Sequence, residues 1–226
     1  MTSWASDPAK TSVCAPAFRF VSRRQTDRSS QKGAGVLVQR TTKGWSKRPG
    51  RWATSESGPA QYLSLDIDGS WAELIRARDL TDPGLFPLQA VDMWQVHVCE
   101  QDVADLSTFD ALHAAGIDPA IAVQRDYTPA QALGAELAAS GFRGMLSPSA
   151  ALLGGVNLTL FGGRNSRCYP TLPPYWDDPD REDRHIPVVK LAHGAPPPIE
   201  LLDRVVFRDS PHPGLEAWHS GATQAR

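Results

Sequence analysis

The chain has 226 residues, of which 41% are hydrophobic and 21% charged, a balance typical of one globular domain with short tails. The net charge of −2 excludes an overall electrostatic preference for nucleic acid or membrane, although the first 51 residues hold eleven basic and two acidic residues. Because no run of about 18 apolar residues and no apolar leader occurs, we expect no membrane span, no signal peptide and a cytoplasmic location.

Cysteine and histidine usage points away from disulfides and metals. Cys14, Cys99 and Cys168 are odd in number, widely spaced and form no CxxC pair. This pattern favours reduced thiols in a cytoplasmic protein. The six histidines show neither HxxxH nor HExxH spacing. We therefore expect no metal site.

The first half of the chain begins with a polar, basic stretch. Residues 1–34 show little periodicity, and we interpret them as a poorly ordered N-terminal arm. The first predicted strand covers 35–38. A second strand at 61–65 leads into a helix at 70–78, which Asp68 or Ser70 is able to cap, and a third strand covers 93–99.

The second half alternates helices and strands. Helices are predicted at 108–115 and 128–140; Thr128 caps the latter, Pro129 takes its first position and Gly141 ends it. Further strands are predicted at 145–146, 156–161, 186–191 and 204–207, and the tail from residue 210 reads as irregular. The fold class is α+β, a compact mixed β-sheet core with flanking helices. The predicted boundaries are an arm at 1–34, a domain at 35–209 and a tail at 210–226.

One candidate site begins with the segments GRWA (50–53), QYLS (61–64) and WAEL (71–74). Arg51 lies in a Gly-flanked loop, Tyr62 on the next strand and Glu73 on the next helix, so the three side chains can converge on one cleft. A guanidinium matches phosphate geometry, a tyrosine offers a flat face for a base, and a carboxylate binds ribose hydroxyls or stabilises an oxocarbenium-like centre. From these residues alone, a surface ion pair of about 0–1 kcal/mol and a core tyrosine are the more common explanation.

The segment 141–158 is the second part of this candidate site. Ser147 and Ser149 bracket a proline directly after a buried strand, and a glycine pair and Asn157 follow. Small residues let backbone amides and hydroxyls approach a phosphate closely, although a plain strand–turn–strand has the same pattern. Neither GxSxG nor a Walker loop is present, which disfavours a hydrolase elbow and a P-loop. We infer that the two segments together form one site for an anionic nucleotide.

Taken in order, these motifs resemble the RES family, toxins of bacterial toxin–antitoxin pairs. The matching segments are GRW at 50–52, YLS at 62–64, WAELIR at 71–76 and GMLSPSAALLGGVNLTLF at 144–161. The segments 102–106 and 126–141 also resemble sequences of this family, so the resemblance covers about residues 35–161. It implies a fold similar to ADP-ribosyltransferases, NAD+ as substrate, and an Xre-type helix-turn-helix antitoxin as partner, whose C-terminal part covers the active site.

The resemblance also implies two arginines and a tyrosine at the binding site. Arg51 matches the arginine of the GR-aromatic motif, and Arg40, after the predicted strand at 35–38, matches the arginine that the family has on its first strand. The loop between them is shorter and more basic than the family pattern. Both arginines are expected to neutralise the pyrophosphate, and Tyr62 to stack on or bond to the nicotinamide riboside end.

The catalytic residues implied by the resemblance are Arg51, Glu73 and Ser149. Glu73 is expected to orient the ribose and stabilise positive charge as nicotinamide leaves. Ser149 is preferred over Ser147 because it directly precedes the Ala-Ala of the motif, and it is expected to hydrogen-bond the carboxamide or a phosphate.

The function implied is an NAD+-degrading toxin, a glycohydrolase or phosphorylase that releases nicotinamide, with inorganic phosphate as a possible co-substrate. Two alternatives remain open: a mono-ADP-ribosyltransferase that modifies a host protein, and a catalytically inactive nucleotide-binding module. We expect the protein to bind neither nucleic acid directly nor a membrane.

Overall fold

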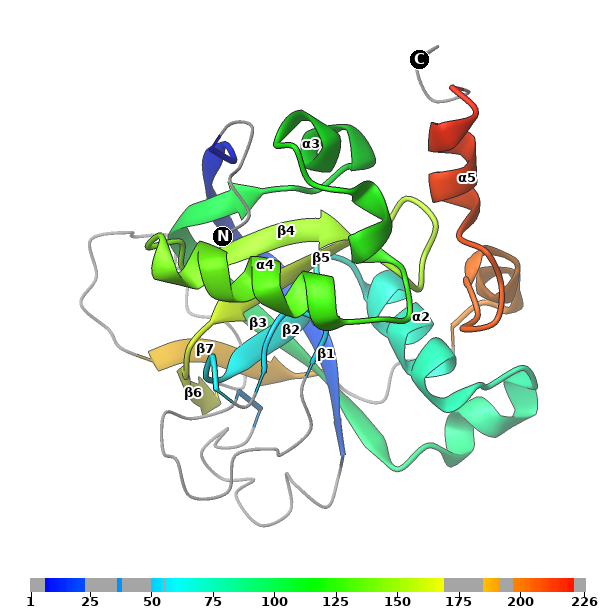
Figure 1. Ribbon diagram of the computed structural model, residues 1–226. Helices are drawn as coiled ribbons and strands as arrows, with labels where there is room; N and C mark the ends of the chain where they lie inside the picture. The colour runs from blue at the N-terminus through cyan, green and yellow to red at the C-terminus, as the bar shows by residue number, and fades with distance from the viewer. Residues whose placement is uncertain are drawn as a thin grey trace.

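The computed structural model describes residues 7–22, 36–37, 50–54, 56–168, 185–191 and 197–221. Within them, strands and helices alternate around one mixed sheet (Figure 1), which confirms the predicted α+β class with a sheet core and flanking helices. The strands are β1 (Lys10–Ser22), β2 (Ala60–Ser64), β3 (Val91–Asp105), β4 (Gly144–Pro148), β5 (Val156–Phe161), β6 (Asn165–Cys168) and β7 (His185–Lys190).

The helices lie on the outside of this sheet. They are α2 (Ile67–Arg78), α3 (Phe109–Ala114), α4 (Thr128–Ala139) and α5 (Pro213–His219), with 3-10 turns η1 (Pro83–Leu88), η2 (Pro119–Ala122) and η3 (Ile199–Arg204). In Figure 1, α4 crosses in front of β4 and β5, whereas α2 and α5 lie toward the right of the view. Among the described residues, no helix is long and apolar enough to cross a membrane.

The strand pairings form a closed circuit. β1 pairs with both β2 and β3, and β2 connects to β3 through β5 and β4, while β7 and β6 extend the sheet beyond β3. The long ladder between β1 and β3 is antiparallel and runs from Lys10 opposite Ala104 to Ser22 opposite Val91. Inside the circuit, Val13, Val96 and Leu158 belong to one apolar cluster. Burial of this cluster stabilises the sheet.

Two further apolar clusters fasten the helices to the sheet. One joins α3, η2 and α4 to β4, with Leu133, Leu137 and Met145 among its members. The other joins α2, η1 and η3 to β3, with Ile75 and Met93 among its members. α2 and α4 therefore cover different parts of the sheet, and both are held rigidly against it.

The structure corrects the expectation of a poorly ordered N-terminal arm. Residues 10–22 of that segment form β1, which has partners on both of its edges. Only Lys10 and Arg19 are basic within this strand, and Val13, Ala17 and Val21 are buried at every fourth position. Most of the basic residues counted in this region follow Ser22, so averaging the charge over the whole segment concealed an apolar strand. Of the predicted first strand at 35–38, only residues 36 and 37 are described; both are buried.

The cysteine prediction was also wrong for one pair. Cys14 on β1 and Cys99 on β3 lie directly opposite each other in the antiparallel ladder, with Cα atoms 4.0 Å apart, and form a disulfide. Sequence spacing did not reveal the pair because 85 residues separate the two positions and only the register of the strands brings them together. Neither cysteine lines the cleft described below.

Several element ends differ from their predictions. α2 begins three residues earlier, because Asp66 and not Asp68 or Ser70 caps it, accepting a hydrogen bond from the amide of Gly69. Thr128 is the first residue of α4 and not its cap. The predicted strand at 204–207 is largely the end of η3 and a single bridge from Val205 to Leu152, and the irregular tail contains α5.

A glycine in α4 permits close packing against the loop that carries Arg51. A Cβ atom on Gly134 would lie 2.0 Å from the carbonyl oxygen of Trp52. We expect Gly134→Ala to lower the free energy of unfolding by about 1–3 kcal/mol, as overpacking does, although alanine favours a helix by about 1 kcal/mol. Denaturant unfolding measures this change. Ala132→Gly, at an exposed site of the same helix, provides the propensity control, and a stabilised Gly134→Ala protein contradicts the packing argument.

Candidate functional site

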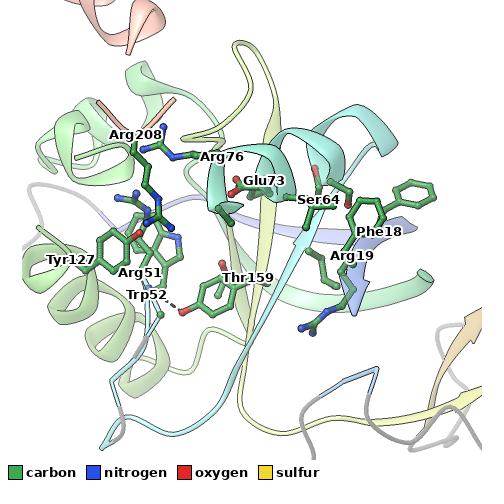
Figure 2. A pocket seen from close by; sticks show the side chains of 18 residues that line it. Phe18, Arg19, Arg51, Trp52, Ser64, Glu73, Arg76, Tyr127, Thr159 and Arg208 are labelled. Carbon is green, nitrogen blue, oxygen red and sulfur yellow. Dashed lines mark hydrogen bonds between the residues drawn. The ribbon is translucent and has the colours of Figure 1, made fainter. Parts of the chain in front are cut away.

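A cleft of about 420 Å³ opens between β1, β2, β5, α2 and the loop at residues 50–52. Figure 2 shows its side chains, with Glu73 and Thr159 in the middle, Arg51, Arg76 and Arg208 gathered at one end near Tyr127, and Arg19 on the other side. Arg51, Tyr62 and Glu73, which the sequence predicted to converge, all line this cleft.

Arg51 is held in place by a tight turn. The turn is closed by a hydrogen bond from the Gly50 amide to the Ala53 carbonyl, 3.0 Å. The Arg51 Nη1 atom donates to the Gln124 carbonyl at 2.7 Å and its guanidinium lies 4.4 Å from the centre of the Tyr127 ring. Burial lowers the pKa of Arg51, while the nearby Tyr127 and Glu73 act in the opposite direction. The guanidinium is thus fixed at the edge of the cleft with one face on an aromatic ring.

Tyr62 connects the same turn to β2. Its hydroxyl accepts a hydrogen bond from the Trp52 amide at 3.1 Å. A Cβ atom on Gly50 would lie 2.1 Å from this hydroxyl oxygen, which explains the glycine before Arg51. Burial raises the pKa of Tyr62 to about 12, so the phenol stays neutral at physiological pH.

Glu73 receives two hydrogen bonds on a single carboxylate oxygen. Its Oε1 atom accepts from the Ser149 hydroxyl at 3.1 Å and from the Asn157 amide nitrogen at 2.6 Å. Ser149 is only 1% exposed and is not among the residues that line the cleft. It therefore lies behind Glu73 and orients the carboxylate, whereas the sequence analysis expected it to bond a carboxamide or a phosphate. Ser149, not Ser147, is the serine that reaches Glu73.

Arg19 is the site residue that sequence reasoning missed. It lies on β1, the first strand of the described residues, and lines the cleft. Its Nε and Nη1 atoms are shielded from solvent and make no hydrogen bond to any described residue, and burial lowers its pKa to about 10. Arg40, the predicted first-strand arginine, lies outside the described residues. The available signal for Arg19 was a single arginine inside an apolar run with strand-forming residues, 13–21.

Other buried polar atoms on the cleft wall also make no hydrogen bond within the described part of the chain. They are Ser64 Oγ on β2, Ser70 Oγ on α2, and Asn157 Oδ1 and Thr159 Oγ1 on β5. Since the Asn157 amide nitrogen donates to Glu73, its oxygen must face away from the carboxylate. Such atoms are costly to bury without a partner, and their concentration in one cleft is typical of a binding site for a polar ligand.

The positively charged end of the cleft extends toward the C-terminal segment. Arg76 on α2 donates from Nη1 to the Val206 carbonyl at 2.5 Å, and burial, with repulsion from Arg208 and Arg125, lowers its pKa. The Arg208 backbone is held by Arg125, whose Nε atom donates to the Arg208 carbonyl at 3.1 Å. Arg76 and Arg208 also line an adjoining cavity of about 320 Å³. Several guanidinium groups around one carboxylate favour a ligand with more than one negative charge.

Comparisons with known proteins concern the family and the fold. A family model described as the RES domain matches residues 28–181, more than half of the chain. The fold is similar to that of the MbcT toxin in the crystal structure of the M. tuberculosis MbcT–MbcA toxin–antitoxin complex, with a TM-score of 0.54 and 21% sequence identity over 80% of this chain and 86% of that one. No curated protein matches the sequence significantly. At this identity, the structural likeness shows the fold alone.

Proposed function

The chain belongs to the RES domain family, and we propose that it is the toxin of a toxin–antitoxin pair that consumes NAD+ and releases nicotinamide. The observation that carries this proposal is the wall of the cleft. Arg19, Ser64, Ser70, Asn157 and Thr159 present buried polar atoms that have no partner within the described chain, next to a carboxylate held by two donors. A dinucleotide carries hydroxyls, an amide and phosphates, which are groups that can hydrogen-bond to these atoms.

Glu73 is the residue that we propose to act on the reacting bond. When the bond between the ribose C1′ and the nicotinamide nitrogen breaks, its electron pair leaves with neutral nicotinamide and positive charge develops on the ribose. The Glu73 carboxylate stabilises that charge. Because Ser149 and Asn157 both donate to Oε1, the carboxylate is oriented before the reaction. An acceptor oxygen, from water or phosphate, then bonds to C1′, with loss of a proton when the acceptor is water.

The arginines bind the pyrophosphate in this proposal. Arg51 is held at one end of the cleft and Arg19 on the other side, and both guanidinium groups suit phosphate oxygens. Arg19 takes the role that the sequence analysis gave to the first-strand arginine, since β1 is the first strand of the described residues. The role of Arg40 stays a prediction. Tyr62, neutral and beside Arg51, is proposed to pack against the nicotinamide riboside end.

The partner and the place of action are also proposals. The fold is similar to that of a toxin found in a toxin–antitoxin complex, which supports an antitoxin as partner. That this antitoxin covers the cleft is an expectation from the family resemblance. An Xre-type helix-turn-helix protein is the partner expected from the family resemblance, and the cytoplasm is the expected compartment. The relation to ADP-ribosyltransferases likewise stays a prediction.

Incubation of the pure protein with NAD+ tests the proposal, with and without inorganic phosphate. We expect release of nicotinamide, and a second product, ADP-ribose or its 1-phosphate, that identifies water or phosphate as acceptor. Labelled NAD+ added with a cell lysate shows whether a protein becomes ADP-ribosylated instead. Absence of nicotinamide release under all three conditions would contradict an NAD+-consuming enzyme.

A further inference from the structure

The C-terminal segment that follows the family match packs against the loop that carries Ser149. Residues 197–221 lie beyond the matched region 28–181. The Val206 amide donates to the Ala151 carbonyl at 2.8 Å, and the Leu153 amide donates to the Arg204 carbonyl at 3.3 Å. The loop that carries Ser149 is therefore bordered by a segment outside the family match.

His212 is the buried polar residue of this segment. Its exposed fraction is 9%, its ring makes an edge contact with Phe109, and its Nε2 atom lies 3.1 Å from the Ser149 carbonyl oxygen. A carbonyl oxygen only accepts, so Nε2 carries the proton and donates. Nδ1 accepts the Leu215 amide at 3.3 Å and thereby caps α5. Both ring nitrogens are used by the neutral tautomer, and burial, which lowers the pKa of His212, agrees with it.

Ser149 links this histidine to the catalytic carboxylate. Its hydroxyl oxygen accepts the amides of Ala151 and Leu152, each at 3.1 Å, which leaves the hydroxyl hydrogen for Glu73. The hydroxyl has one direction in which to donate, provided that the Ser149 backbone stays in place. His212 is a side chain that holds this backbone, and it does so from outside the cleft.

We infer that His212 is a positioning residue for the reaction: by holding the Ser149 carbonyl, it keeps the Ser149 hydroxyl on Glu73. The inference rests on the proposed function for its catalytic consequence, but the contact itself is independent of it. His212 does not line the cleft, although it lines the adjoining cavity. Its effect therefore falls on the rate of the chemical step and not on the affinity for NAD+.

Two variants separate the two bonds of the ring. His212→Asn places an amide oxygen near the position of Nδ1, which keeps the cap on α5 but removes the bond to Ser149. His212→Gln places an amide nitrogen near the position of Nε2, which keeps the bond to Ser149 and removes the cap. We expect His212→Asn to lower kcat by about 10- to 100-fold, with KM within about twofold of wild type. His212→Gln should recover most of this loss.

Two controls test whether the change at His212 lowers kcat through Ser149. His219→Asn replaces an exposed histidine on the same helix and should leave kcat unchanged. Ser149→Ala should lower kcat by itself, and the double variant with His212→Asn should lose little more, because both changes break one link. Equal kcat values for the two His212 variants, a loss that appears in KM, or additive losses in the double variant would overturn the inference.

Hydrogen exchange tests the contact without reference to activity. The amides of Ala151 and Leu152, which bond to the Ser149 hydroxyl, should exchange about tenfold faster in His212→Asn and near the wild-type rate in His212→Gln. If wild-type protein releases no nicotinamide, the proposed function fails, and the exchange result alone decides whether His212 holds the Ser149 loop. Unchanged exchange in both variants would overturn the inference.

Discussion

Glu73→Gln is expected to slow nicotinamide release by about 10²–10³-fold, the usual effect of removing one preorganised electrostatic group from a reaction centre. Glutamine keeps the shape of the side chain, and its oxygen still accepts hydrogen bonds from Ser149 and Asn157, which both contact Oε1 in the native protein. Only the negative charge is lost. KM should therefore change less than about threefold, which initial-rate kinetics with NAD+ can measure.

The matched control is Glu200→Gln, an exposed residue of η3 outside the cleft. It removes the same charge from the protein and should leave both kcat and KM unchanged. If Glu73→Gln retains wild-type kcat, Glu73 does not stabilise the developing charge. If instead only KM rises, Glu73 acts in binding and not on the reacting bond.

Arg19→Met is expected to affect stability and binding in opposite directions. Two of its guanidinium nitrogens are shielded and make no hydrogen bond within the described residues, and its pKa of about 10 keeps it charged at neutral pH. Replacing an unpaired buried polar group with an apolar one of similar length should raise the free energy of unfolding by about 1–3 kcal/mol. The affinity for NAD+ should fall by about 10- to 100-fold, as expected for loss of a charged hydrogen bond to phosphate.

Thermal unfolding and calorimetric NAD+ binding measure the two effects on the same preparation. A gain of 1 kcal/mol corresponds to about 2–4 °C in Tm for a protein of this size. Arg78→Met, on the exposed face of α2, removes the same charge outside the cleft and should change neither value substantially. A destabilised Arg19→Met protein would show that Arg19 serves the fold and not a ligand.

The sequence predicted the local parts of the site well. Arg51, Tyr62 and Glu73 lie on a turn, a strand and a helix that follow one another directly, so short-range patterns were sufficient to bring them to one cleft. Ser149 was expected to bond a carboxamide or a phosphate, whereas in the structure it is buried and donates to Glu73. Whether a hydroxyl faces the ligand or the back of a carboxylate depends on burial, and the motif does not encode this.

Errors in the N-terminal third have a common physical cause. Charge counting over 51 residues hid β1, and with it both Arg19 and the partner of Cys99. The strand is stabilised by its ladder with β3, which follows it by about 80 residues in the sequence. Strand pairing at this separation depends on tertiary packing, and local propensity carries little information about it.

The sequence by itself determined the fold class, the order of the family motifs and three side chains of the cleft, because each is encoded in patterns of a few neighbouring residues. The tertiary structure alone decided the rest: Arg19 and Asn157 reach the cleft through strand register, and His212 reaches the Ser149 loop from the C-terminal segment. These contacts join residues far apart in the chain. Their geometry arises only when the sheet closes its circuit and the apolar clusters pack.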